Sequence, residues 1–262
     1  MHPDQTVSKE AHMQDAIIIS DTHLGSENCE AKQLTRFLEE VLDGERPTHK
    51  LILNGDVFDS IDFRRLKKNH WKVLSLLRKL SDRIEILWIN GNHDGPAEIV
   101  SHLLGVEVKD EMILESGGRK FLFHHGHRFD DFIDNHPILT AVADLVYRLL
   151  QKIDRSHHFA KLAKKKSKTF LRCTRKIETK SIEYARKLGC DVVCCGHTHQ
   201  ALINVVGDTT YCNSGCWTEK PCHYLTVSNG AIELHEFVEE SAEGSTLEVD
   251  ESHRAARLSY SV

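Results

Sequence analysis

The sequence has few prolines and cysteines, and it lacks a long hydrophobic run. Its 262 residues include 5 prolines and 8 cysteines. The cysteines are too sparse for a disulfide scaffold and fit free thiols in a reducing compartment. The longest apolar runs, such as residues 16–19, fall far short of the roughly 20 residues of a membrane-spanning helix, and residues 1–15 lack the apolar centre of a secretory signal. We therefore expect a cytoplasmic protein that does not span a membrane.

The formal net charge of −5 conceals a segregation of charge along the chain. Residues 155–187 contain twelve Lys or Arg and two acids, whereas residues 236–251 contain seven acids and no Lys or Arg. The basic segment is suited to an anionic ligand or surface, and the acidic segment is typical of a solvated tail. An acidic chain without aromatic residues interleaved among its basic ones disfavours a nucleic-acid partner.

Short apolar runs alternate with longer helical patterns, which favours a layered α/β domain. The predicted strands cover residues 15–20, 50–53, 84–89, 120–124, 191–195, 202–206, 209–213, 223–227 and 232–237. Several of them end directly in a cluster of polar residues. Because ligand sites in open α/β sheets form beyond the carboxyl ends of the strands, we expect these clusters to lie close together.

Residues 137–188 do not follow this alternation and contain no convincing strand. Apolar residues recur there at the three- and four-residue spacing of an amphipathic helix, and a second helical stretch carries the basic cluster. We therefore divide the chain into a core of residues 1–136 and 189–240, a helical insertion of residues 137–188 that we expect to bind substrate, and a flexible acidic tail of residues 241–262.

Five polar clusters share carboxylate, amide and imidazole groups, which together suit divalent transition metals. They are Asp21-Thr22-His23, Gly55-Asp56, Gly91-Asn92-His93-Asp94, His125-Gly126-His127 and Gly196-His197-Thr198-His199. On an extended segment alternate residues share a face, so Asp21 and His23 can reach one ion, as can His197 and His199. The glycines permit tight turns that let the side chains converge.

In this order, the five clusters resemble the signature of the calcineurin-like metallophosphoesterase superfamily, from residue 15 to about residue 213. The resemblance implies an α/β fold: a two-layered β-sandwich flanked by helices, here with a helical cap insertion, and a two-metal site at the strand ends. It implies one metal held by Asp21, His23, Asp56 and His199, and another held by Asp56, Asn92, His125 and His197. Asp56 would bridge the two ions. We expect Mn²⁺, with Fe²⁺ and Zn²⁺ as alternatives that suit the same donors.

The resemblance also assigns roles around the metals. His93 would donate a hydrogen bond or a proton to the phosphoryl group or the leaving oxygen, and Asp94 would orient its ring. The family pattern favours the His immediately before Gly126, so His125 is preferred over His124 and His127. Asp59 is either a residue that supports the site or a helix N-terminal acid; the sequence leaves both interpretations open.

The helical insertion resembles the cap of UDP-2,3-diacylglucosamine pyrophosphohydrolases, which release UMP and an acylated sugar phosphate in lipid A synthesis. This implies a nucleotide-linked glycolipid as substrate. The expected substrate-binding residues are Asn92, His93, Lys164, Lys165, Lys168, Arg172 and His197. Against this, an apolar stripe is usually helix packing and a Lys run is usually a solvated face. The enterobacterial enzyme also has Arg where this chain has His93.

Two alternative functions and one further expectation remain open at this point. The chain could act on another lipid-linked or nucleotide phosphodiester, since the superfamily site does not fix the substrate. It could also be a nonenzymatic scaffold, although such relatives typically lose the residue that corresponds to His93. Finally, a basic amphipathic helix can lie on anionic lipid without spanning it. We therefore expect peripheral contact with the cytoplasmic face of the inner membrane.

Overall fold

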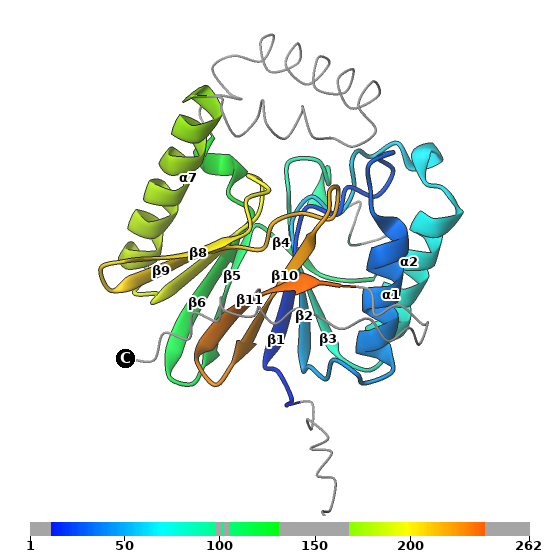
Figure 1. The fold of residues 1–262 in the computed structure, drawn as a ribbon, viewed down its shortest axis with the longest axis horizontal. Helices are drawn as coiled ribbons and strands as arrows, with labels where there is room; N and C mark the ends of the chain where they lie inside the picture. The colour runs from blue at the N-terminus through cyan, green and yellow to red at the C-terminus, as the bar shows by residue number, and fades with distance from the viewer. Residues whose placement is uncertain (1–11, 98–100, 102–104, 131–167, 239–262) are drawn as a thin grey trace, which may run out of the picture.

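Two β-sheets pack face to face and carry helices on their outer faces (Figure 1). The computed structural model describes residues 12–97, 101, 105–130 and 168–238. Within these residues the helices are α1 Ala31–Leu42, η1 Phe63–Arg65, α2 Lys68–Leu80, η2 His127–Phe129 and α7 Lys168–Lys187. The strands are β1 Ala16–Ile19, β2 Lys50–Asn54, β3 Glu85–Ile89, β4 Val108–Lys109, β5 Glu111–Ser116, β6 Arg119–His124, β7 Val192–Cys195, β8 Leu202–Val206, β9 Thr209–Asn213, β10 Cys222–Ser228 and β11 Ala231–Phe237.

The two sheets have the same kind of mixed topology. The first has the order β11-β10-β1-β2-β3-β4, in which β1, β2 and β3 are parallel. The second has the order β5-β6-β7-β9-β8, in which β6, β7 and β9 are parallel. Antiparallel strands lie at one edge of the first sheet and at both edges of the second.

The core between the sheets follows from the alternation of side chains along each strand. In β1, Ala16 and Ile18 belong to the apolar cluster that also contains Phe121 and Val192 of the second sheet. Ile17, on the opposite face of β1, belongs to a separate cluster under α1 and α2. All four residues of β1 are therefore buried, which explains why this strand reads as a continuous apolar run.

The helix α7 covers the outer face of the second sheet. Its Ile182 and Ala185 are buried in one cluster with Val193 of β7 and Tyr211 of β9. The fold thus has four layers, helix, sheet, sheet and helix, and the predicted α/β sandwich is confirmed. Among the helices within the described ranges, none is long and apolar enough to cross a membrane.

Most predicted strands form within one or two residues of their expected bounds. Two short strands, β4 and β5, were not predicted. The sequence 111–116 begins and ends with polar residues, and it forms a strand because it pairs antiparallel with β6 along its whole length. The predicted insertion of residues 137–188 is described only from residue 168, and Lys168–Lys187 form the helix α7. Residues 137–167 and the tail 241–262 lie outside the described residues.

Candidate metal centre

The predicted site residues lie at the carboxyl ends of the parallel strands of both sheets. Asp21 and His23 follow β1, Asp56 follows β2, Asn92 and His93 follow β3, His125 follows β6, and His197 and His199 follow β7. The strand ends of the two sheets meet there: the Nδ2 atom of Asn54 in β2 donates to the carbonyl of Cys194 in β7 at 3.2 Å. Each sheet therefore contributes part of one site, as ligand sites in α/β sheets commonly do.

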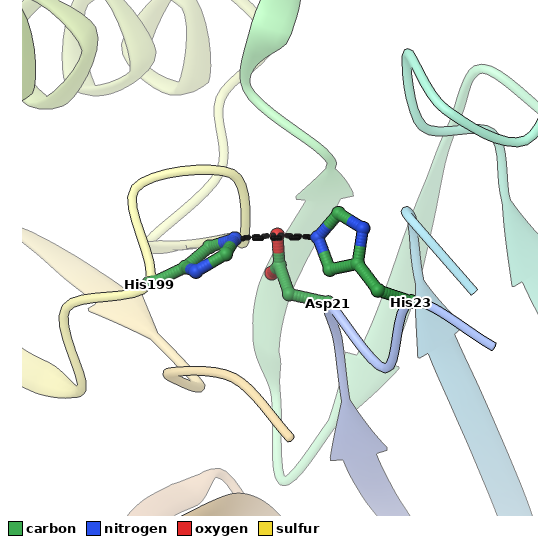
Figure 2. Close-up of side chains that lie close together, drawn as sticks. All are labelled: Asp21, His23 and His199. Carbon is green, nitrogen blue, oxygen red and sulfur yellow. Dashed lines mark hydrogen bonds and ion pairs between the residues drawn. The ribbon is translucent and has the colours of Figure 1, made fainter. Parts of the chain in front are cut away.

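Asp21, His23 and His199 form the first group of potential ligands. The Oδ1 atom of Asp21 lies 3.2 Å from Nε2 of His199 and 4.0 Å from Nε2 of His23. Figure 2 shows the two rings on opposite sides of this carboxylate, with their nitrogens turned toward it. The two Nε2 atoms lie 3.4 Å apart. One ion could therefore contact all three side chains.

Asp56, His125 and His197 form the second group. The Oδ2 atom of Asp56 lies 3.2 Å from Nε2 of His125 and 3.7 Å from Nε2 of His23. A single carboxylate oxygen thus lies between a histidine of each group. This is the position expected of the bridging residue in a two-metal site.

The buried Nε2 atom of His125, which faces Oδ2 of Asp56, has no hydrogen-bond partner. A buried polar atom without a partner is costly, so an unpaired imidazole nitrogen pointing at a carboxylate favours a cation between them. Carboxylate and imidazole donors suit Mn²⁺, Fe²⁺ or Zn²⁺. The residues present therefore fit a pair of divalent ions; the identity of the ions and the role of each residue as ligand stay predictions.

The protonation states of the buried side chains at the site favour cation binding. Burial alone would raise the pKa of the Asp56 carboxyl, but the neighbouring His125 ring lowers that pKa well below its ordinary value. Conversely, burial would lower the pKa of His125, and Asp56 raises it to about 9. Metal binding at this pair would displace the proton from the His125 ring. Burial lowers the pKa of His23 to about 4, which keeps this ring in the neutral form that binds metals.

Five of the seven predicted ligands have a left-handed backbone conformation. Among the described residues, the non-glycine residues with positive φ are Asp21 (53°), His23 (44°), Asp56 (52°), His197 (64°), His199 (59°) and Asn229 (46°). Side chains other than glycine disfavour this region, and such conformations tend to gather at functional sites. The turns after β1, β2 and β7 therefore aim their side chains at one point at a cost in backbone energy.

Two glycines leave the space that these turns need. A Cβ atom on Gly91 would contact the backbone nitrogen and Oδ1 of Asp56. A Cβ atom on Gly196 would lie 2.5 Å from Oδ2 of Asp21. Neither glycine has a positive φ in the structure. They are required here because backbone and carboxylate approach closely, rather than for the conformational freedom expected from the sequence.

Backbone amides and one hydroxyl fix the two carboxylates. The backbone nitrogen of His197 donates to both oxygens of Asp21 at 3.1 Å, and the Ser20 hydroxyl donates to Oδ2 of Asp21 at 2.5 Å. The backbone nitrogen of His93 donates to Oδ1 of Asp56 at 2.9 Å. Ser20 was not predicted as part of the site, although its position beside Asp21 was a signal.

Asp94 does not have the role that the resemblance assigned to it. Its oxygens accept hydrogen bonds from the backbone nitrogens of Phe58 and Gly91 and from Nε1 of Trp88. Burial, followed by the nearby Asp56 charge, raises its pKa to about 6. The expectation that Asp94 orients the His93 ring is wrong, because its side chain turns inward to hold the loop backbone.

Asp59, rather than Asp94, contacts the His93 ring. Its carbonyl oxygen lies 3.1 Å from Nδ1 of His93, and its Oδ1 lies 3.7 Å from Nδ1 of His23. The guanidinium of Arg65 contacts its other carboxylate oxygen at 2.5 Å. Of the two interpretations left open by the sequence, the structure therefore favours a residue that supports the site.

The choice of His125 among three histidines agrees with the geometry. His125 faces Asp56, and its Nδ1 lies 3.0 Å from the carbonyl of Asn54. His124 points to the other side, where its Nε2 lies 3.6 Å from Sγ of Cys195. The His127 ring lies 5.5 Å from that of His125 and 6.5 Å from that of His197, at the rim of the site.

The expected substrate-binding residues are only partly described. Asn92 and Arg172 are exposed, the first in the loop after β3 and the second on α7. Lys168 is the first residue of α7, and Lys164 and Lys165 lie outside the described residues. The helix α7 reaches the site through Ile177, whose Cγ2 would lie 3.4 Å from a Cβ atom on Gly126.

Comparisons with known proteins give one family match and several structural similarities. The family model of the calcineurin-like phosphoesterase superfamily domain matches residues 15–228. No curated protein sequence matches the chain. Similar solved structures include the phosphoesterase YfcE from E. coli (14% identity, 85% of this chain, 99% of that chain, TM-score 0.46) and a novel archaeal phosphodiesterase (18%, 84%, 98%, TM-score 0.45). Another is the Zn²⁺ complex of Vps29 from Entamoeba histolytica (16%, 84%, 97%, TM-score 0.42).

Proposed function

This chain belongs to the calcineurin-like phosphoesterase superfamily and is a metal-dependent phosphoester hydrolase, and we propose that it cleaves the pyrophosphate of UDP-2,3-diacylglucosamine. The products would be UMP and 2,3-diacylglucosamine 1-phosphate. The enzyme would act with two Mn²⁺ ions at the cytoplasmic face of the inner membrane, where such a lipid-linked substrate resides. The scaffold alternative is not retained, because the family is one of phosphoesterases and the sequence contains His93 together with all seven predicted ligand residues.

The observation that supports hydrolysis is the pair of ligand groups joined through Asp56. Two divalent ions at such a centre supply positive charge to a phosphoryl group and lower the pKa of water toward neutrality. Asp21, His23, Asp56 and His199 would hold one ion, and Asp56, Asn92, His125 and His197 the other. The Asp21 and Asp56 carboxylates are fixed before any substrate binds, because backbone amides donate hydrogen bonds to both.

His93 is placed to act on the substrate. Its Nδ1 must donate its proton to the Asp59 carbonyl, because a carbonyl oxygen only accepts. The other ring nitrogen, Nε2, is then the atom that can exchange a proton with a substrate oxygen. The His93 ring lies 5.0 Å from the ring of His23, so it borders the first ligand group. This position suits transfer of a proton to the leaving oxygen.

The choice of substrate rests on the helical insertion and on its charge. A lipid-linked nucleotide needs an anion-binding surface and an apolar surface close to the metals. The helix α7 carries exposed Arg172, Arg175 and Lys176 and packs beside the His125 strand end. The presence of His93 in place of Arg separates this chain from the enterobacterial enzyme. A different lipid-linked or nucleotide phosphodiester is therefore the alternative substrate.

The test is incubation of the purified chain and Mn²⁺ with detergent-dispersed UDP-2,3-diacylglucosamine, followed by chromatographic detection of UMP. The matched control is the Asp56→Asn variant, which should release none. Release of UMP by the wild type only would support the proposal. Turnover of a simple aryl phosphodiester without release of UMP would reject this substrate and retain the hydrolase.

A further inference from the structure

His197 differs from the other predicted ligand histidines in what its Nε2 atom faces. In His125 and His199, Nε2 points at a carboxylate of the metal groups, at 3.2 Å in both cases. In His197, Nε2 lies 3.0 Å from Oδ2 of Asp130, a residue outside both groups. The two side chains are 10% and 12% exposed, so water screens this contact little.

This contact determines which nitrogen of His197 is left for a metal. A neutral imidazole has one N–H and one lone pair. A carboxylate accepts the N–H, so Nε2 carries the proton and the lone pair is on Nδ1. Ligand histidines commonly donate their second nitrogen to a carboxylate in this way, which fixes both the tautomer and the ring orientation.

Asp130 is held in place by a packed turn. It directly follows η2, and the backbone nitrogen of Asp130 donates to the carbonyl of His127 at 2.9 Å. The guanidinium of Arg128 stacks on the ring of Tyr184 in α7, at 4.3 Å from its centroid. The same guanidinium contacts Glu111 of β5 at 2.6 Å, and the Tyr184 hydroxyl donates to that carboxylate at 2.8 Å. This network ties the turn to both β5 and α7.

We infer that Asp130 is a positioning residue for the second metal, which orients His197 so that Nδ1 faces the ion while Nε2 donates to the carboxylate. The Arg128–Glu111–Tyr184 network keeps Asp130 at that distance. The helix α7, part of the segment expected to bind substrate, thereby also sets the geometry of a metal ligand. The inference concerns metal binding and holds whichever phosphoester is the substrate.

The test measures Mn²⁺ binding to the full-length chain without substrate, from the electron paramagnetic resonance signal of free Mn²⁺. We expect two sites in the wild type. In Asp130→Ala the dissociation constant of one site should rise about 10- to 100-fold, the usual effect of removing a carboxylate behind a ligand histidine. Asp130→Asn keeps an acceptor oxygen and a similar shape, so it should show a smaller rise. Arg128→Gln should also weaken one site.

Asp191→Ala is the matched control, because Asp191 lies at the opposite end of β7 and accepts a hydrogen bond from the backbone of Lys120. It should leave both Mn²⁺ sites unchanged. A purely structural role is tested with a double-mutant cycle. If Asp130 acts through His197, Asp130→Ala should add nothing in a His197→Ala background. Wild-type binding by Asp130→Ala, or a further loss in that background, would overturn the inference.

Discussion

Several predicted ligands at the metal centre have an unfavourable backbone conformation that places their side chains toward the metal site. The left-handed φ of Asp21, Asp56 and His197 is stabilised by specific hydrogen bonds. The backbone nitrogen of Asp21 donates to the Gly55 carbonyl at 2.9 Å, and that of His197 donates to Asp21 itself. Each strained turn therefore fixes the next one. The site is built from mutually dependent turns, and a small change in one should alter the others.

Gly196→Ala tests this dependence. The new Cβ would press on Oδ2 of Asp21 and on the Ser20 hydroxyl, and overpacking of this kind costs about 1–3 kcal/mol. We expect weaker Mn²⁺ binding at the first ligand group together with a lower melting temperature. Gly44→Ala is the control: Gly44 also resists a side chain because its φ is +82°, but a Cβ there contacts nothing within 4 Å.

Gly44→Ala should therefore reduce stability and leave Mn²⁺ affinity unchanged. Both variants would be followed by calorimetric melting and by Mn²⁺ titration. Equal Mn²⁺ affinities for Gly196→Ala and the wild type would contradict the requirement for close approach at Asp21.

Substitutions of the neighbouring residues His93 and Asp94 should have different effects, the first on catalysis and the second on stability. His93→Gln removes the group that exchanges a proton with the substrate, and general acid–base catalysis contributes about 10²- to 10⁴-fold. We expect kcat on an aryl phosphodiester to fall by about that factor with little change in melting temperature. The two oxygens of Asp94 accept hydrogen bonds from three donors, and Asp94→Asn replaces one of these oxygens with an NH2 group that cannot accept.

The main effect of Asp94→Asn should accordingly be a decrease of about 1–3 kcal/mol in the free energy of unfolding, measured by urea unfolding. Steady-state kinetics on both variants provide the comparison. The distinction drawn from the hydrogen bonds would be contradicted if Asp94→Asn lowered kcat as much as His93→Gln while keeping wild-type stability.

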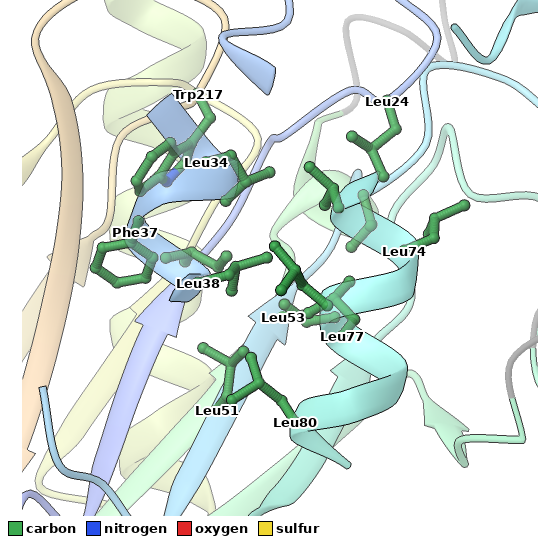
Figure 3. Close-up of a cluster of buried hydrophobic side chains, with 14 of the residues drawn as sticks. Leu24, Leu34, Phe37, Leu38, Leu51, Leu53, Leu74, Leu77, Leu80 and Trp217 are labelled. Atoms are coloured by element: carbon green, nitrogen blue, oxygen red, sulfur yellow. The ribbon is translucent and has the colours of Figure 1, made fainter. Parts of the chain in front are cut away.

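At the level of elements, each sheet is anchored by its own helices. Figure 3 shows leucines of α1 and α2 packed on Leu51 and Leu53 of β2, with Trp217 and Phe37 at one side of the cluster. This packing fixes the carboxyl end of β2, from which Asp56 projects. On the other sheet, α7 fixes β7 through Ile182 and so supports the turn of His197.

A buried histidine lies in the contact between β6 and α7. His124 packs edge-on to the rings of Phe129 and Tyr184, and burial lowers its pKa to about 3. The folded protein therefore keeps this ring neutral, whereas an unfolded chain protonates it below a pKa of about 6.5. Stability should thus be unaffected above pH 6.5 and should fall as the pH drops from 6.5 toward 3.

Between pH 6.5 and 5.0 this single group should cost about 2 kcal/mol. His124→Phe keeps an aromatic ring in the same contact and cannot titrate. The measurement is urea unfolding of metal-free wild type and variant at both pH values. The variant should lose about 2 kcal/mol less than the wild type over this range. Equal losses would show that His124 is protonated in the folded state.

The parts of the site that the sequence predicted are those carried by local motifs. Asp21 and His23 directly follow β1, and His197 and His199 directly follow β7, so each pair lies at the carboxyl end of a parallel strand, as the motifs predict. The packing of the two sheets then brings the two pairs together, and the backbone nitrogen of His197 donates to Asp21. Asp130 was missed because its partner His197 is 67 residues away along the chain. The role of Asp94 was predicted wrongly, because adjacency in sequence to His93 does not tell which way a side chain turns.

In the whole molecule, the metal centre joins the two sheets. The first ligand group combines Asp21 and His23 from the first sheet with His199 from the second, and the second group combines Asp56 with His125 and His197 in the same way. Two divalent ions would therefore cross-link the sandwich at its open edge. Without cations, only contacts within the protein would hold the two carboxylates and the unpaired Nε2 atom of His125 together.

Removal of metal should accordingly destabilise the whole fold. A ligand present at 100 times its dissociation constant stabilises the native state by about 2.7 kcal/mol. For a chain of this size that amounts to a melting temperature about 5–10 °C higher. We expect EDTA to lower the melting temperature by this amount, and Mn²⁺ in excess over the chelator to restore it. His125→Ala should abolish most of the difference, whereas His49→Ala, far from the site near the start of β2, should retain it. A chelator-insensitive melting temperature in the Mn²⁺-loaded wild type would show that the ions do not join the two sheets.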